Sequence, residues 1–161
     1  MVMAYIGLGS NLDKPAARIA GAIQSIGQIP ATTLLCFSSS YRSRPQGPQN
    51  QPDYINAVAQ VDTRLTAEQL LECLQAIEKQ QGRVRTQRWG PRTLDLDLLL
   101  FGDIVLRSDT LTVPHPEMHR RAFVLYPLYE IAPDIEIPGQ GRIERLLRGI
   151  DPDLVEKLEQ A

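Results

Sequence analysis

Leucine and aspartate alternate at residues 94–98, and this pattern fixes both a strand of the fold and the direction of its side chains. Successive strand residues point to opposite faces of a sheet. The even-numbered leucines of residues 94–100 would then face the core, while Asp95 and Asp97 project together from the other face. Two like charges on one face repel each other and lose hydration on burial unless a cation lies between them. The pattern therefore favours a buried strand that carries a cation site.

Four arginines lie in the ten residues that end two positions before this strand: Arg83, Arg85, Arg88 and Arg92. Arginine forks bind phosphate groups, and Mg²⁺ is held by one or two carboxylates together with phosphate oxygens. Asp95 and Asp97 beside these arginines predict a site for a metal–polyphosphate complex. Two simpler interpretations stay open: the arginines form a solvated loop, or Arg88 and Arg92 pair with the aspartates. Trp89 is either a packing anchor for this loop or part of a lid over a ligand.

The overall charge and hydropathy limit the classes of partner. The chain of 161 residues has a formal net charge of −2, which argues against broad nucleic-acid binding. No stretch approaches the roughly 20 apolar residues of a membrane span. We expect a single domain over residues 1–161 in the cytoplasm, without nucleic-acid or membrane partners.

Hydrophobic periodicity predicts the other elements. Strands are expected at residues 2–8, 32–41 and 54–63, with a short one at 104–106 after a Gly-Asp turn. A first helix is expected to end at Ile26, with Asn11 or Asp13 as its cap, and a second to follow a capping box of Thr66 and Gln69. Further helices are expected at residues 122–131 and in a tail at residues 143–159. This order predicts an α+β fold with a ferredoxin-like core, a mostly antiparallel sheet, and helices packed on one face. Long loops at 43–53 and 82–92 would form a cleft on the other face.

Tyr54 and Asn56 have the same parity on the strand expected at 54–63, so both project from one face. An aromatic ring and a carboxamide can stack on a flat heterocycle and bind its edge. Phe123 could supply the opposite wall. The alternatives are a partly exposed strand tyrosine and a core phenylalanine.

The absence of several common motifs excludes the sites that usually bind nucleotides. A GxxxxGK[ST] loop and a GxGxxG turn are both absent, and with two histidines in the chain a histidine metal site or a serine triad is not expected. His115 and Arg121 are candidates for phosphate or ribose contacts. Two further functions stay open: a non-catalytic ligand-binding or RNA-binding ferredoxin-like module, and an ATP-dependent kinase acting on another flat alcohol.

Together these segments resemble the 6-hydroxymethyl-7,8-dihydropterin pyrophosphokinases of folate biosynthesis. The resemblance covers nearly the whole chain, and its most specific part is Arg-Trp-Gly-Pro-Arg-Thr-Leu-Asp-Leu-Asp at residues 88–97. The other matching segments are residues 5–12, 47–56, 82–85, 113–118 and 130–133. The resemblance implies transfer of pyrophosphate from ATP to the hydroxymethyl group of the pterin, giving AMP and the pterin diphosphate, by a protein that is a monomer.

The resemblance also implies a role for each site residue. Asp95 and Asp97 would hold two Mg²⁺ ions, and with Arg83 and Arg92 they would form the catalytic set. The residues implied to bind ATP are Gln75, Glu78, Arg83, Arg85, Arg88, Trp89, Arg92, Leu98, Thr112, His115 and Arg121. Those implied to bind the pterin are Ser43, Arg44, Gln46, Tyr54, Asn56, Trp89 and Phe123. Ser43 and Gln46 depart from the threonine and the apolar residue usual in the family, which bears on pterin affinity rather than on the reaction.

Overall fold

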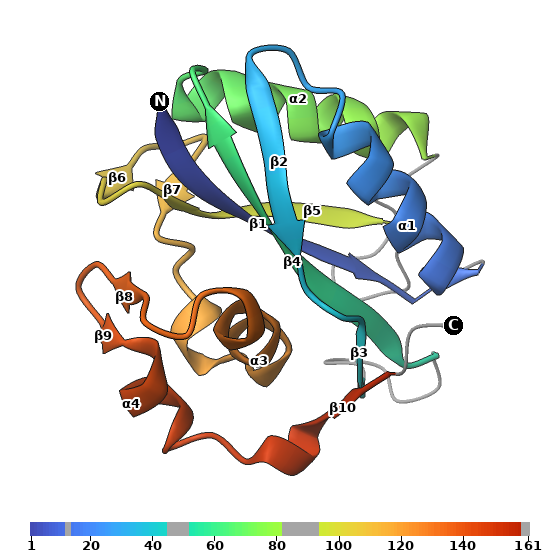
Figure 1. Cartoon of the computed structure of the whole chain (residues 1–161), viewed down its shortest axis with the longest axis vertical. Helices are drawn as coiled ribbons and strands as arrows, with labels where there is room; N and C mark the ends of the chain where they lie inside the picture. Colours follow the sequence, from blue (N-terminus) through green and yellow to red (C-terminus); the bar gives the residue numbers. More distant parts are fainter. Residues whose placement is uncertain (12–13, 45–51, 82–93, 159–161) are drawn as a thin grey trace.

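The computed structural model describes residues 1–11, 14–44, 52–81 and 94–158. A six-stranded antiparallel sheet with strand order β10-β3-β4-β1-β5, and with β2 also paired to β4, forms its centre (Figure 1). These strands are β1 (Val2–Ser10), β2 (Thr32–Phe37), β3 (Tyr41–Ser43), β4 (Tyr54–Thr63), β5 (Asp95–Phe101) and β10 (Val155–Lys157). The predicted α+β class with a ferredoxin-like, mostly antiparallel core is confirmed.

Strand β4 organises the sheet, because its residues 55–63 pair with β1 along one edge. Its other edge is shared between β2, which pairs with residues 59–63, and β3, which pairs with residues 54–56. The single strand predicted at 32–41 is therefore wrong in its bounds. At the break, Ser38 donates its backbone N–H to Val58 O, and its hydroxyl accepts from Val58 N. This serine keeps the β4 edge paired where the regular ladder stops.

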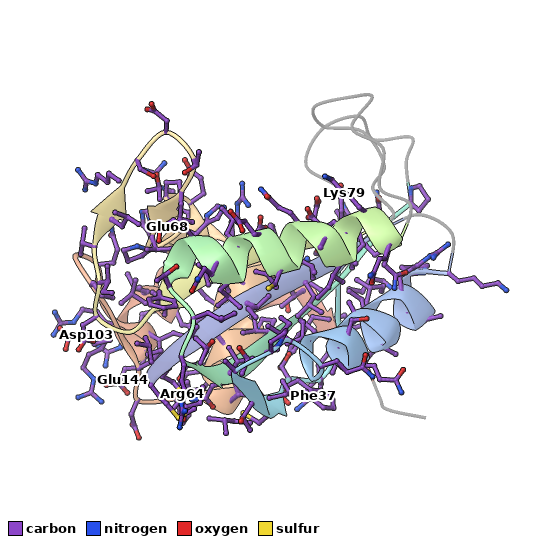
Figure 2. The ribbon with its side chains drawn as sticks, turned by 90° about the horizontal axis from the view of Figure 1, so that it is seen from above. Phe37, Arg64, Glu68, Lys79, Asp103 and Glu144 are labelled. Carbon is purple, nitrogen blue, oxygen red and sulfur yellow. The ribbon has the colours of Figure 1, made fainter. Side chains whose placement is uncertain are left out.

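Two amphipathic helices cover one face of the sheet, α1 (Pro15–Ile26) and α2 (Ala67–Gln80), as Figures 1 and 2 show. Their buried residues join the inward side chains of β1, β4 and β5 in one hydrophobic core. The predicted capping box at Thr66 and Gln69 is present. The predicted cap of α1 is wrong in the described part of the chain: the N-cap is Lys14 in a left-handed conformation, and Asn11 Nδ2 donates to Pro52 O.

The opposite face is covered in part by α3 (Ala122–Ile131), against which α4 (Ile143–Leu147) packs. Helix α3 has the predicted bounds, but the prediction that the helices lie on one face holds for α1 and α2 alone. Its residues Val124, Leu125 and Leu128 are buried with Val58 and the β5 leucines in a second core. Because α3 is apolar on most of its sides, it packs between the sheet and α4.

The C-terminal region contributes less helix than its sequence predicts. After α4, a 3₁₀ turn η2 (Pro152–Leu154) leads into β10, which pairs with β3 at the sheet edge. The Gly-Asp turn after β5 is present, but the strand that follows, β6 (Leu106–Arg107), pairs with β7 (Thr112–Val113) instead of β5. The remaining short elements are the pair β8 (Glu136–Ile137) and β9 (Gly141–Arg142) and the 3₁₀ turn η1 (Met118–Arg120). In the described ranges, no helix combines the length and apolar character that crossing a bilayer demands.

Strand β5 contains an irregularity that changes the side its residues face. The register with β1 shifts between Leu98 and Leu100, so that Leu99 has no partner of its own. Leu99 and Leu100 then both join the core beneath α3, and Phe101 returns to the core beneath α1 and α2. The prediction that Leu100 lies opposite the aspartates is therefore wrong, because a bulge interrupts strict alternation.

Candidate active site

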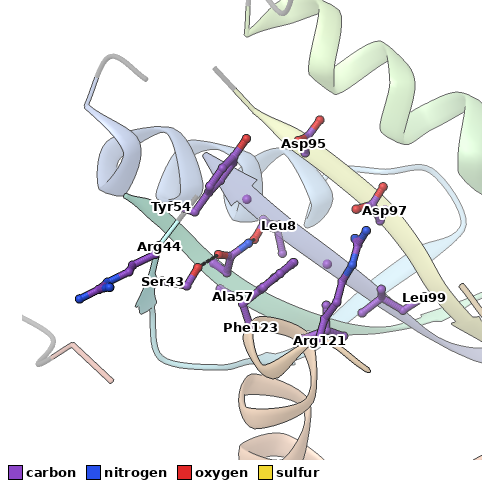
Figure 3. A pocket seen from close by; sticks show the side chains of 14 residues that line it. Leu8, Ser43, Arg44, Tyr54, Ala57, Asp95, Asp97, Leu99, Arg121 and Phe123 are labelled. Atoms are coloured by element: carbon purple, nitrogen blue, oxygen red, sulfur yellow. Dashed lines mark hydrogen bonds between the residues drawn. The ribbon is translucent and has the colours of Figure 1, made fainter. Parts of the chain in front are cut away.

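A cavity of about 140 Å³ opens on the sheet face that carries α3, beyond the N-terminal end of that helix (Figure 3). Its walls come from β1, β3, β4, β5 and the start of α3. The lining residues are Gly7, Leu8, Gly9, Ser43, Arg44, Tyr54, Asn56, Ala57, Asp95, Asp97, Leu99, Arg121, Phe123 and Val124. The structure thus brings together predicted site residues that are up to 80 positions apart in the sequence.

One wall carries the two predicted aspartates. Asp95 is half-buried and Asp97 exposed, and both project from β5 into the cavity, as the alternation predicts. Between them, the Leu96 N–H donates to Glu78 Oε2 at 2.9 Å. The Glu78 carboxylate is buried and belongs to α2, which covers the sheet face opposite the cavity. This contact fixes the backbone that carries both acids.

The floor of the cavity is the backbone of β1 at two glycines. Gly9 lies opposite Asp95 on one side and Asn56 on the other, and Gly7 lies opposite Asp97. A Cβ on Gly7 would stand 3.3 Å from the Leu99 side chain. Glycine inside a strand is typical of places where another group approaches the backbone closely. The two residues leave a trough between the acidic strand and the strand of Asn56.

The other wall presents a fixed carboxamide. Asn56 is buried, its Oδ1 accepts from Ser43 Oγ at 3.3 Å, and its Nδ2 donates to Leu8 O at 3.4 Å. A carboxamide has two donor hydrogens and two acceptor positions on its oxygen. With respect to the described residues, one donor and one acceptor position of Asn56 are left for a ligand edge in the trough.

Two aromatic rings and a guanidinium complete the cavity. Tyr54 at the start of β4 and Phe123 in the first turn of α3 both point into it (Figure 3). Arg121 directly precedes α3, and its Cζ lies 5.5 Å from the centroid of the Phe123 ring. Figure 3 shows the Arg121 side chain extended toward Asp97. The cavity therefore offers apolar rings at one end and charged groups at the other.

His115 lies beside the charged end, although it lines a second hollow of about 450 Å³ together with Thr112. The backbone N–H of His115 donates to Leu99 O at 2.9 Å, and its ring Nδ1 accepts from the backbone N–H of Glu117 at 3.2 Å. Burial, and to a smaller extent the nearby Arg121 charge, lower the pKa of His115 to about 4, while Glu117 opposes the shift. The imidazole is neutral at physiological pH. With Nδ1 accepting, its proton is assigned to Nε2, which is left as a donor.

Three predicted nucleotide contacts lie elsewhere in the described structure. Glu78 is buried and accepts from the Leu96 N–H of β5, so it supports the strand of the aspartates, and its predicted contact with ATP stays a prediction. Gln75 is exposed on α2. The Leu98 side chain is buried in the core beneath α1 and α2, so its side chain does not reach the cavity. The predicted residues Gln46, Arg83, Arg85, Arg88, Trp89 and Arg92 lie outside the described residues.

Sequence reasoning missed the floor of the site. The strand predicted at residues 2–8 ends before Gly9, whereas β1 continues through Gly7 and Gly9 to Ser10. Two glycines separated by one residue inside an apolar strand are the signal that could have found the floor. Leu99 has the same parity as Asp95 and Asp97, so alternation accounts for its place on their face, whereas Val124 lines the wall because of the packing of α3, which no local signal predicts.

The donor set fits magnesium in partnership with a phosphate ligand. Within the described ranges, no three His, Cys, Asp or Glu residues gather as a complete metal cluster. Two carboxylates from one strand are what Mg²⁺ uses when phosphate oxygens and waters supply the other ligands. Asp95 and Asp97 both face the cavity and meet this requirement.

Comparisons with known proteins agree with this geometry. A model of the 7,8-dihydro-6-hydroxymethylpterin-pyrophosphokinase family matches residues 5–133. The 2-amino-4-hydroxy-6-hydroxymethyldihydropteridine pyrophosphokinase of Haemophilus influenzae is 50% identical over 148 residues, covering 92% of each chain. The protein of the same name from Pseudomonas aeruginosa is 48% identical over 157 residues, covering 98% of this chain and 97% of its own.

The fold is also found among solved structures. The crystal structure of an HPPK-DHPS in complex with substrates superposes with a TM-score of 0.77 at 12% identity. The match covers 99% of this chain and 49% of the solved one, so this chain spans about half the length of that structure. At this identity the likeness bears on the fold alone.

Proposed function

The chain belongs to the 7,8-dihydro-6-hydroxymethylpterin-pyrophosphokinase family, and we infer that it carries out this family's reaction in the cavity described above. The reaction is transfer of a pyrophosphoryl group from ATP to the hydroxymethyl group of 6-hydroxymethyl-7,8-dihydropterin, a step of folate biosynthesis. The products are AMP and the pterin diphosphate.

One observation carries the assignment to this cavity. Asp95 and Asn56 lie on opposite sides of Gly9 in neighbouring strand pairs, so an acidic wall faces a heterocycle-binding wall across a floor without side chains. A phosphate chain beside the acids and a flat ring beside the carboxamide would then meet over β1. This juxtaposition is what transfer between two bound substrates requires, because most of the acceleration comes from holding the reacting groups in place.

The aromatic end is proposed to hold the pterin. Tyr54 and Phe123 would contact the faces of the ring, and Asn56 would bind its polar edge through the donor and acceptor that Ser43 and Leu8 leave available. Arg44, which also lines the cavity, would add a charge at its rim. A buried carboxamide held in one orientation discriminates between rings by the order of their donors and acceptors.

The charged end is proposed to hold the triphosphate. Arg121 would neutralise phosphate charge next to Phe123, and neutral His115 would donate from Nε2 to a phosphate or ribose oxygen. Arg83 and Arg92 are proposed to grip the phosphates and stabilise charge during transfer, while Arg85, Arg88 and Trp89 help to place ATP. Thr112 is proposed to extend the ATP site into the second hollow. Preorganised positive groups are effective here because charge spreads over phosphoryl oxygens in the transition state.

Asp95 and Asp97 are proposed to hold Mg²⁺, with two ions expected alongside ATP. When bound, the metal would neutralise the phosphate oxygens and bring them into line with the pterin alcohol. The two aspartates would hold the metal in a fixed position, since Glu78 accepts a hydrogen bond from the backbone between them. We further propose that the chain acts as one domain and as a monomer in the cytoplasm.

Calorimetry with a non-hydrolysable ATP analogue tests this assignment against a ligand-binding or RNA-binding module. We expect tight binding of the analogue with Mg²⁺ and weak binding without it, followed by binding of the pterin to the loaded protein. Equal affinity with and without Mg²⁺ would contradict the metal role of the aspartates. A kinase for another flat alcohol would bind the analogue in the same way but fail to bind the pterin.

A further inference from the structure

The carboxylate of Glu130, near the end of α3, joins three separate segments of the chain. Its Oε2 accepts from Ser39 N at 2.9 Å and from Ser39 Oγ at 3.1 Å. Its Oε1 accepts from Tyr41 OH at 2.6 Å and lies 3.7 Å from Lys157 Nζ. These partners belong to the break between β2 and β3, to β3 itself, and to β10. One side chain thus ties a helix to the edge of the sheet.

The tied strand forms one wall of the cavity. Tyr41 lies directly opposite Asn56 in the pairing of β3 with β4, and Ser43 lies opposite Tyr54. Residues directly opposite each other in an antiparallel pair share one face of the sheet. The Tyr41 ring therefore stands on the same face as Asn56 and reaches Glu130 from there.

The helix forms the facing wall. Phe123 is seven residues before Glu130 on α3, or two turns away along the same helix. Glu130 itself does not line the cavity. Its contacts nevertheless set the distance between the helix that carries Phe123 and the strand pair that carries Asn56, because both sides meet at this carboxylate.

Strand β3 needs this support because it is short. It has three residues, and its outer partner β10 also has three. The chain leaves the ladder at residues 38–40, and there Glu130 accepts the Ser39 N–H. Partial burial raises the pKa of Glu130, but the hydrogen bonds from Tyr41 and Ser39 and the charge of Lys157 hold it below its ordinary value. Glu130 is thus a carboxylate at neutral pH, and a glutamine would present a donor where an acceptor is needed.

We propose that Glu130 is a positioning residue for the pterin end of the active site, acting through Tyr41 and Ser39 on the wall that carries Ser43 and Asn56. The proposal rests on the assignment of the pterin to this cavity. Its action is confined to one end, since Asp95 and Asp97 lie on β5, on the far side of β1 from β3.

The test compares Glu130→Gln, Tyr41→Phe and the double variant with a matched control, Glu72→Gln, which changes an exposed glutamate on α2. Two dissociation constants are measured by calorimetry: that of the ATP analogue with Mg²⁺, and that of 6-hydroxymethyl-7,8-dihydropterin on the loaded protein. Loss of a charge-assisted hydrogen bond predicts about tenfold weaker pterin binding for Glu130→Gln. The affinity for the analogue should stay within about twofold, as should both affinities of the control.

The double variant separates positioning from general stability. Tyr41→Phe breaks one side of the same contact, so the double variant should lose little more pterin affinity than Glu130→Gln alone. If Glu130→Gln does not fold, the milder Tyr41→Phe carries the test by itself. Equal losses for both ligands, or a lower melting temperature with unchanged pterin affinity, would overturn the proposal. Wild-type protein that binds no pterin would instead contradict the proposed function.

Discussion

Gly9 and Asn56 are opposite each other in the pairing of β1 with β4, and a Cβ on Gly9 would stand 2.7 Å from Asn56 Nδ2. Real Cβ contacts are not this short, so any side chain at position 9 must displace the carboxamide. The amide is held by Ser43 and by Leu8 O, so its displacement breaks both contacts. The orientation of Asn56, the proposed pterin-binding group, thus depends on the absence of a side chain at position 9 of the neighbouring strand.

The Gly9→Ala variant should therefore bind the pterin at least about tenfold more weakly, because Asn56 loses its orientation and two hydrogen bonds. Binding of the ATP analogue with Mg²⁺ should change less. Gly21→Ala is the control, since the added Cβ there would meet only the end of the Gln81 side chain, at 3.4 Å. Unchanged pterin affinity in Gly9→Ala would show that the orientation of Asn56 is unimportant.

Replacement of either acid should abolish metal-dependent turnover while the fold stays intact. Asp95→Asn and Asp97→Asn keep the side-chain volume but remove the charge that is proposed to hold Mg²⁺, so we expect turnover to fall at least about 100-fold. Both side chains reach the cavity rather than the core, so the melting temperature should change little. Near-normal AMP production by both variants would contradict the metal assignment.

The aromatic wall should affect the pterin far more than the nucleotide. Phe123→Leu keeps an apolar side chain at the start of α3 but removes the flat ring and its contact with Arg121. Stacking of this kind is worth roughly 1–3 kcal/mol per ring, so the dissociation constant of the pterin should rise by about tenfold or more. Leu128→Met changes a buried residue of the same helix that does not line the cavity, and it is the control for altered packing of the helix. Normal pterin binding by the Phe123→Leu variant would show that this ring does not contact the pterin.

The protonation of His115 gives a prediction that is independent of activity. Its pKa is lowered from 6.5 to about 4, first by burial and then by the Arg121 charge, so its NMR signals should show a neutral ring down to about pH 5. Arg121→Gln should raise this pKa only partly, because burial is the larger cause. His119→Gln assigns the signals of the two histidines in the chain. A His115 that titrates near 6.5 would contradict the assignment of a half-buried, neutral donor.

The same shift fixes the sign of a pH effect on stability. The unfolded chain binds a proton at His115 below its ordinary pKa of 6.5, whereas the folded protein does so only near 4. As pH falls through this window, protonation favours the unfolded state, and the free energy of unfolding decreases. The His115→Gln variant cannot bind that proton, so it should lose less stability between these pH values. An equal loss in both proteins would contradict this account.

Local patterns in the sequence predicted the elements that local forces determine. Strand β4 and helix α3 have the bounds that their periodicity indicates, and the capping box at Thr66 is present. The shared face of Asp95 and Asp97 also follows from alternation, because no bulge occurs before Leu98. At the site, parity alone placed Tyr54 and Asn56 together.

Features that depend on distant contacts could not be predicted in this way. The break between β2 and β3 is held by Val58 and Glu130, and β10 becomes a strand because β3 offers it an edge. The bulge in β5 is defined by its register with β1. The need for glycine at position 9 arises from its contact with Asn56, which lies 47 positions later in the sequence. Each of these requires knowledge of which segments meet across the sheet.

The products of the reaction with ATP, Mg²⁺ and 6-hydroxymethyl-7,8-dihydropterin give the most direct test of the central claim. Transfer of pyrophosphate from ATP to the pterin alcohol predicts one AMP for each pterin diphosphate formed, and no ADP. Formation of ADP with a pterin monophosphate, or no pterin product at all, would contradict it.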